Sequence, residues 1–266
     1  MGSQEGAIGI FDSGVGGLTV FRRLVEYLPW ESVIYLGDTA RVPYGTKSAG
    51  TVVRYARACA NLLIERGVKM LVVACNTASA YALDALREDL DVPVLGVIEP
   101  GAASAVTSTR NKRVGVIGTA GTISSGQYER AIHWLAPDVQ VFSKSCPLFV
   151  PLAEEGWTEG DVPRRVAREY LGQLAEQSID TLVLGCTHYP LLKGVIAETM
   201  GNGVTLVDSA ESTAGVARDM LGAAGAGDDH NAPSYQFLVS DAPESFARVG
   251  KRFLGCDIEH VEWVDC

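Results

Sequence analysis

The sequence predicts an α/β protein of two similar, doubly wound parallel-sheet domains, related by pseudo-twofold symmetry, with the functional site in the cleft between them. Short apolar strands alternate with amphipathic helices, which is typical of parallel sheets covered on both faces. The 29 glycines suit the many tight turns of such a fold. The pattern occurs twice, and two matching stretches, residues 71–77 (LVVACNT) and 182–188 (LVLGCTH), each carry a cysteine.

Apolar runs and turn residues define the elements of the first half. A strand at residues 8–11 breaks at a glycine-rich turn, and the helix after it ends before Pro29. A longer helix ends at Gly67, a residue suited to a helix C-terminus. The predicted strands are residues 8–11, 33–36, 69–74 and 94–98, and the predicted helices are residues 18–28, 48–65 and 77–90.

The second half repeats this order. Pro163 suits the first turn of a helix, whereas the stretch from Cys146 to Glu155 is predicted to be a long loop. The predicted strands are residues 113–117, 140–142, 181–185 and 204–207, and the predicted helices are residues 125–135, 162–177 and 191–200. Because the two series match strand by strand, we interpret them as a tandem duplication of one α/β unit.

The residues after 208 have no counterpart after the first repeat. They are predicted to form a helix (212–223), a Gly/Asp-rich linker (225–229), a strand (236–240), a second helix (244–254) and a last strand (258–264). We expect this tail to pack on the first unit. The first domain would then be discontinuous, comprising residues 1–98 and 209–266, and the second domain would comprise residues 99–208.

Charge and hydropathy exclude several classes of partner. The formal net charge is −10 and the isoelectric point is about 4.9, so a nucleic-acid partner is not expected. No apolar run approaches the roughly 20 residues that span a bilayer, and the first residues do not resemble a signal peptide. We therefore expect a cytoplasmic protein with no membrane partner.

Six cysteines occur in the chain, and their spacing indicates no metal site. None forms a CxxC pair, and no Cys/His cluster has zinc spacing. Disulfides are not expected in a reducing cytosol. Four of the six have no readable polar context and are interpreted as packing residues: Cys59, Cys146, Cys256 and Cys266.

The remaining two, Cys75 and Cys186, end apolar strands where a helix begins. Ligands of open parallel sheets bind at such strand ends, and a helix N-terminus lowers the pKa of a thiol. Two thiols that face each other across a cleft permit two-base chemistry, in which one removes a proton from a carbon and the other protonates the opposite face. The product of that reaction is the mirror image of the substrate. For either cysteine alone, a buried packing role is the alternative.

Polar residues beside these strand ends are further candidates for the site. Asp12 ends the first strand and could bind an ammonium group or act on Cys75, although an Asx-turn role is the alternative. His188 could act as an acid or as a hydrogen-bond partner beside Cys186. Glu154 is a candidate because its loop leaves the strand next to that of Cys186. Hydroxyl and amide groups that could bind carboxylates, or simply cap helices, are Ser13, Asn76, Thr77 and Thr187.

Nucleotide and Schiff-base chemistry lack support in the sequence. The glycines of residues 14–17 match the dinucleotide-binding fingerprint poorly, because Thr19 stands where the third glycine belongs. No GxxxxGK[ST] phosphate loop occurs, and no lysine stands out as a Schiff-base residue.

Taken together, four motifs resemble the glutamate racemases of the aspartate/glutamate racemase superfamily. They are residues 11–19 (FDSGVGGLT), 43–45 (PYG), 74–78 (ACNTA) and 185–190 (GCTHYP), and the resemblance covers about residues 7–220. It implies a cofactor-independent enzyme that interconverts L- and D-glutamate and supplies D-glutamate for peptidoglycan. It also implies a homodimer, as is common in the family.

The resemblance implies roles for individual residues. Cys75 and Cys186 would be the two acid/base residues, and Asp12, Glu154 and His188 would tune their thiols. The implied substrate contacts are Asp12, Ser13, Tyr44, Gly45, Asn76, Thr77, Thr187 and His188. No metal is implied. The alternatives are another racemase of the superfamily, acting on aspartate or a hydantoin, a one-thiol decarboxylase, and a non-catalytic protein that binds a small anion.

Overall fold

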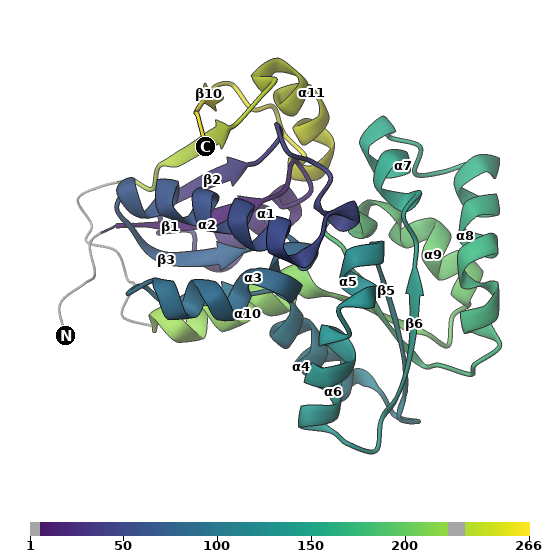
Figure 1. Ribbon diagram of the computed structural model, residues 1–266. Coiled ribbons are helices and arrows are strands. Elements are labelled where there is room, and N and C mark those ends of the chain that lie inside the picture. Colours follow the sequence, from purple (N-terminus) through teal and green to yellow (C-terminus); the bar gives the residue numbers. More distant parts are fainter. Residues whose placement is uncertain (1–5, 223–231) are drawn as a thin grey trace.

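The computed structural model describes residues 6–222 and 232–266 and contains two parallel β-sheets (Figure 1). The predicted linker at 225–229 lies outside the described residues. The first sheet has the order β10-β9-β2-β1-β3-β4. Its strands are β1 (Ala7–Asp12), β2 (Val33–Gly37), β3 (Val68–Val73), β4 (Val94–Gly96), β9 (Tyr235–Val239) and β10 (Glu262–Trp263).

The second sheet forms a separate lobe beside the first (Figure 1) and has the order β6-β5-β7-β8. Its strands are β5 (Arg113–Gly118), β6 (Gln140–Ser145), β7 (Thr181–Gly185) and β8 (Thr205–Asp208), and all three pairings are parallel. Two parallel sheets with helices between their strands confirm the predicted fold class.

Helices cover both faces of the first sheet. Successive side chains of a strand point to opposite faces, and the apolar side chains of β1 are buried on both. Ile8 and Ile10 pack toward α1 (Leu18–Tyr27), α10 (Ser209–Leu221) and α11 (Pro243–Leu254). Phe11 packs on the other face, toward α2 (Ala49–Glu65) and α3 (Asn76–Asp89). The other helices are α4 (Ile98–Ser108), α5 (Ala120–Ser124), α6 (Gln127–Leu135), α7 (Phe149–Glu155), α8 (Asp161–Ala175) and α9 (Lys193–Met200).

The tail returns to the first sheet. β9 pairs in parallel with β2, and β10 forms the edge of the sheet beside β9. The helix α11 packs against α1. α10 packs against both α1 and α4, so it contacts both halves of the chain. The division of the chain after residues 98 and 208 stays a prediction. In the part of the chain that the structure describes, no helix combines the length and apolar character needed to cross a bilayer.

Two helices were missed in the sequence. Residues 149–155 form α7 where a loop was predicted, and residues 98–108 form α4, which also shortens the predicted strand 94–98. Each helix carries proline at its third position, Pro100 or Pro151. Proline suggests a break, but a residue in the first helical turn has no intrahelical partner for its N–H. Proline is therefore tolerated there.

Two further boundaries differ from the prediction. The helix expected at 125–135 begins at Gln127 as α6, because Gly126 adopts a left-handed conformation with φ of 66°, and the residues before it form an additional short helix, α5. The strand expected at 258–264 is reduced to Glu262 and Trp263, which pair with β9.

Candidate active site

One small cavity of about 40 Å³ is lined by both thiols. Cys75 follows β3 and caps α3, and Cys186 follows β7. The cavity is lined from both halves of the chain by Ser13, Val42, Pro43, Tyr44, Gly45, Cys75, Asn76, Thr77, Thr119, Val150, Cys186, Thr187 and His188. The structure therefore brings together nine of the predicted site residues. Asp12 and Glu154 lie behind this lining, next to the catalytic candidates.

Asp12 is fully buried at the end of β1. Its Oδ2 accepts a hydrogen bond from the Gly14 N–H at 2.9 Å, as in an Asx turn, whereas its Oδ1 has no partner. Burial raises the pKa of Asp12, although the charge of His188 and the N–H groups of Gly14 and Gly17 oppose this effect. One carboxylate oxygen of Asp12 therefore stabilises the turn, and the other has no hydrogen-bond partner in the described structure.

Cys75 lies in an environment that keeps its thiol neutral. Its sulfur accepts a 3.4 Å hydrogen bond from the Ala78 N–H at the start of α3. Burial and the charge of Asp12 nevertheless raise the pKa of Cys75 to about 12, against the N–H of Ala78 and the side chain of Ser13. The start of α3 lowers the pKa of Cys75 as expected, but the net shift is upward. Desolvation outweighs the effect of the helix N-terminus.

Cys186 is linked to a histidine and a carboxylate. Its sulfur lies 3.8 Å from Nδ1 of His188, and Nε2 of His188 lies 2.9 Å from Oε1 of Glu154. Burial would lower the pKa of His188, but the hydrogen bonds and charges of Cys186 and Glu154 raise it to about 10. Cys186 and Glu154 therefore both favour the protonated imidazole. The two thiols thus have unlike neighbours.

Glycine allows the first half to approach this histidine. A Cβ on Gly16 would lie 2.3 Å from Oγ1 of Thr187 and 2.4 Å from Nδ1 of His188. The Thr19 hydroxyl donates to the carbonyl of Gly16 at 2.9 Å and to that of Thr187 at 3.1 Å. The turn between β1 and α1 therefore forms one wall of the Cys186 environment.

A second set of contacts closes the opposite side of the cavity. The Thr77 hydroxyl lies 2.9 Å from the hydroxyl of Thr119 and 3.1 Å from that of Thr122. A Cβ on Gly45 would lie 2.7 Å from Cβ of Thr119. Tyr128 donates to Oδ1 of Asn76 at 2.7 Å. These residues hold α3 and the 3₁₀ turn η1 (Tyr44–Thr46) against α5 and α6.

Two buried side-chain atoms in the described part of the chain lack a hydrogen-bond partner, and both belong to this site. They are Oδ1 of Asp12, an acceptor, and Nδ2 of Asn76, a donor. Buried polar groups in native proteins are nearly always satisfied, so an unpaired acceptor and donor beside a cavity indicate missing ligand groups of opposite polarity. An ammonium and a carboxylate have the required chemistry.

Several residues of the site were not predicted from the sequence. Thr119 and Thr122 belong to the turn that matches the Asp12–Gly17 turn in the repeat, and this equivalence could have identified them. Tyr128 and Phe253 carry no such signal. Phe253, on α11, stacks edge to face on His188 with ring centroids 5.1 Å apart.

A larger cavity, of about 710 Å³, lies between α3, α4, α6 and α10. It contains neither thiol and none of the predicted site residues, so we assign the chemistry to the smaller cavity. Within residues 6–222 and 232–266, no group of three or more His, Cys, Asp and Glu side chains is arranged to hold a metal ion.

The chain is similar to proteins of one family along almost its whole length. The family model described as Asp/Glu/Hydantoin racemase matches residues 8–217. A glutamate racemase from Geobacter metallireducens is 58% identical over 250 residues, which cover 94% of this chain and 93% of that protein.

Solved structures give the same result. A glutamate racemase isoform from Bacillus anthracis has a TM-score of 0.94 at 41% identity, with 98% of each chain covered. A glutamate racemase from Francisella tularensis, solved in complex with D-glutamate, has a TM-score of 0.92 at 40% identity, again with 98% of each chain covered.

Proposed function

We propose that this chain, which belongs to the Asp/Glu/hydantoin racemase family and is thus an amino-acid racemase, interconverts L- and D-glutamate with two thiols. The observation that carries the two-thiol mechanism is the single cavity shared by Cys75 and Cys186, one from each half of the chain. The choice of glutamate is supported by the names of the similar proteins and by the D-glutamate bound in one of them.

In the proposed reaction, one thiolate removes the α-proton and the other thiol donates a proton to the opposite face of the carbon. The α-proton is a very weak acid, so the site must stabilise a carbanion through preorganised groups in a water-poor cavity. His188 carries a positive charge beside Cys186 and so stabilises negative charge on that sulfur. On the opposite side of the cavity, the charge of Asp12 raises the pKa of the Cys75 thiol.

The unpaired atoms support a binding mode for the amino acid. Oδ1 of Asp12 would accept a hydrogen bond from the substrate ammonium, and Nδ2 of Asn76 would donate one to a carboxylate. An ammonium at Asp12 would also neutralise the charge that raises the pKa of Cys75. The hydroxyls of Ser13, Thr77 and Thr187 and the residues of η1 line the remaining surface.

Substrate entry requires the two halves to separate. A volume of about 40 Å³ holds only a few water molecules, which is less than glutamate needs. We infer that opening occurs along the contacts of Gly45 with Thr119 and of Gly16 with Thr187, and that closure then excludes water.

Incubation with L-glutamate in D₂O, without added cofactor, tests this function. We expect the circular dichroism of glutamate to decay to zero, with one deuterium incorporated at the α-carbon. L-Aspartate, measured in parallel, should racemise much more slowly. Binding of glutamate without exchange at the α-carbon would instead favour a non-catalytic anion-binding protein.

The remaining features are proposed from the resemblance. D-Glutamate would supply peptidoglycan synthesis in the cytoplasm, and rescue of a bacterial strain that requires D-glutamate tests this role. The expected assembly is a homodimer. The exposed apolar side chains of Trp134 and Leu135 on α6 and of Met220 on α10 are available for such contacts, and light scattering measures the mass in solution.

A further inference from the structure

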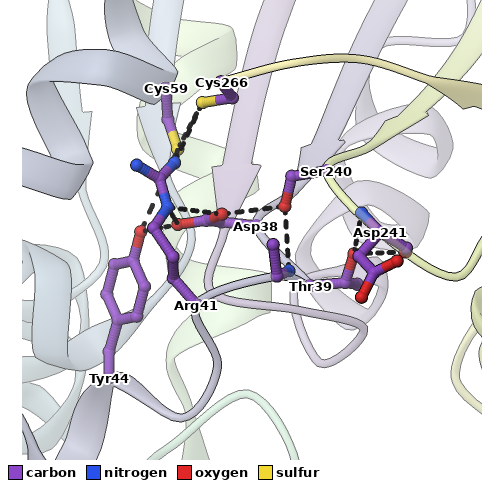
Figure 2. A network of polar contacts seen from close by, with 9 residues as sticks. Asp38, Thr39, Arg41, Tyr44, Cys59, Ser240, Asp241 and Cys266 are labelled. Atoms are coloured by element: carbon purple, nitrogen blue, oxygen red, sulfur yellow. Dashed lines mark hydrogen bonds and ion pairs between the residues drawn. The ribbon is translucent and has the colours of Figure 1, made fainter.

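A second polar network lies behind the wall of the cavity, around Asp38 (Figure 2). Asp38 follows β2 and is fully buried. Its Oδ2 lies 2.7 Å from Nε of Arg41 and accepts a short hydrogen bond from the hydroxyl of Tyr44, and its Oδ1 accepts one from Ser240 at 2.9 Å. The network therefore joins the segment around Tyr44, which lines the cavity, to the segment after β9.

Two cysteines meet at the other end of Arg41 (Figure 2). Cys59 is fully buried in α2, whereas Cys266, in the segment after β10, is half-buried. Their sulfur atoms lie 3.6 Å apart, although the residues are far apart in the sequence. Nη2 of Arg41 lies 3.0 Å from the sulfur of Cys266 and 3.7 Å from that of Cys59.

The two thiols differ in pKa and in solvent exposure. A hydrogen bond with Cys59 and the nearby Arg41 guanidinium lower the pKa of Cys266 to about 7. The same hydrogen bond, burial and the charge of Asp38 raise the pKa of Cys59. Cys266 is closer to the guanidinium and more exposed, so it is the sulfur on which a negative charge is better stabilised.

We propose that Cys266 and Cys59 form a dithiol site that reacts with hydroperoxides, with Cys266 as the attacking thiolate and Cys59 as the resolving thiol. An accessible thiolate next to a cation and within reach of a second thiol has the features of a peroxide-sensitive cysteine. The proposal reverses the interpretation of both residues as packing cysteines. It concerns thiols that do not line the racemase cavity.

The reaction balances with the peroxide as oxidant. The Cys266 thiolate attacks one peroxide oxygen, the O–O bond breaks, and the departing oxygen takes up a proton to leave as water or an alcohol. Cys266 is then a sulfenic acid. The sulfur of Cys59 displaces its hydroxyl, a second water leaves, and an S–S bond forms. The two thiols lose two electrons, which the peroxide gains.

The disulfide would connect α2 to the segment after β10 and remove the negative charge beside Arg41. Asp38 accepts a hydrogen bond from the hydroxyl of Tyr44 and pairs with Arg41, and the same hydroxyl lies 4.0 Å from the sulfur of Cys59. Oxidation of Cys59 therefore occurs next to a residue of the cavity wall. Cytosolic disulfides are mostly transient and redox-sensing, which matches a site of this kind.

Exposure of the intact protein to equimolar hydrogen peroxide, followed by alkylation and peptide mapping without reduction, tests the proposal. We expect the peptides of Cys59 and Cys266 to be joined, and dithiothreitol to separate them. Cys256 is more exposed than Cys266 and has no such neighbours, so it serves as an internal control. Cys256 reacting as fast as Cys266, or a Cys266 that is oxidised without being joined to Cys59, would overturn the proposal.

Two variants test the assigned roles. In Cys59→Ser, the sulfenic acid should persist on Cys266 and be trapped by dimedone. In Arg41→Gln, oxidation of Cys266 at pH 7 should slow about fivefold, because raising a thiol pKa from about 7 by about one unit lowers the thiolate fraction by that factor. Circular dichroism verifies that each variant is folded. Unchanged oxidation in folded Arg41→Gln would contradict the role of the guanidinium, and the mapped thiols report independently of racemase activity.

Discussion

At the scale of single residues, the two thiols occupy equivalent positions of the repeat but differ in their neighbours. Cys75 lies beside the buried Asp12, and Cys186 lies beside His188, which Glu154 contacts. The proposed reaction acts on two mirror-image substrates and uses two acid/base groups on opposite faces of one carbon. Similar basicity in the presence of the ligand, rather than identical surroundings, is what such a reaction requires.

Replacing either thiol should abolish racemisation. We expect Cys75→Ala and Cys186→Ala each to lower kcat by about 10²–10⁴-fold or more, because each removes one acid/base group. Circular dichroism of glutamate measures the loss. Cys256→Ser, at an exposed position, is the control and should retain activity. Near-normal turnover in either alanine variant would contradict the two-base mechanism.

Glu154 should affect the pH dependence rather than the binding of substrate. Glu154 helps to raise the pKa of His188 to about 10, against the effect of burial. In Glu154→Gln we expect His188 to lose its proton at lower pH, so the alkaline decline of kcat/KM should begin earlier. Glu155→Gln, the exposed neighbour, is the matched control. An unchanged pH profile in Glu154→Gln would exclude this role.

At the scale of elements, turns and helix ends bring the two halves together. The turn between β1 and α1 contacts Thr187 and His188 from the other half, and α11 covers His188 through Phe253. Local sequence indicated the turn after β1 and the helix α11, but it did not indicate which surfaces meet. Such contacts depend on how the lobes pack, and packing joins residues that are distant in the chain.

Adding one methyl group to Gly16 should disturb this contact. A Cβ would lie 2.3 Å from Oγ1 of Thr187, so the loop or the histidine must move. We expect Gly16→Ala to reduce kcat/KM on the order of 10²-fold, since displacements of about 1 Å at an active site have effects of that size. Gly50→Ala in α2 meets nothing within 4 Å and should leave the rate unchanged. A fully active Gly16→Ala would show that the contact can open freely.

Truncating Phe253 should affect both stability and the histidine. Phe253 is 2% exposed, and a buried Phe→Ala change costs about 3–5 kcal/mol. We expect the midpoint of urea unfolding to fall and the alkaline limb of the rate profile to move as His188 loses its edge-to-face contact. The control is Lys251→Ala, at an exposed position of the same helix. Equal midpoints for the two variants would rule out a structural role for Phe253.

The helices α4 and α7 illustrate the limits of local patterns. Both contain an early proline that suggests a break, yet both form because a first-turn residue needs no N–H partner. Glu154, a candidate site residue, was expected in a loop, but it lies near the end of α7. The helix is what aims its carboxylate at His188.

At the scale of the whole molecule, buried ionisable groups make the protein sensitive to alkaline pH. The pKa of His188 is raised from 6.5 to about 10, so its contribution is complete below pH 6.5 and is lost as the pH rises through 10. The raised pKa values of Cys75, Tyr35, Tyr44, Tyr128 and Tyr189 act in the same direction at higher pH. Each group is stabilised in its protonated form in the folded state.

The lowered pKa of Cys266, from 9.0 to about 7, acts in the opposite direction between pH 7 and 9. The free energy of unfolding should therefore change little between pH 7 and 9 and decrease above pH 9. Urea unfolding at a series of pH values measures this slope. Relative to the wild type, His188→Asn should gain stability as the pH rises from 6.5 to 9, because the residue that loses stability there is absent. The same pH dependence in both proteins would contradict the assignment of a charged, buried His188.

The sequence by itself determined the α/β class, the two repeats and the strand-end positions of Cys75 and Cys186, because apolar periodicity and turn residues act over a few neighbouring positions. It also identified nine of the thirteen residues that line the cavity, although their roles remain predictions. Only the tertiary structure decided that burial keeps the Cys75 thiol neutral, that Phe253 covers His188, and that Cys59 and Cys266 meet. Desolvation and contacts between distant segments depend on the packing of the whole chain, which no local pattern encodes.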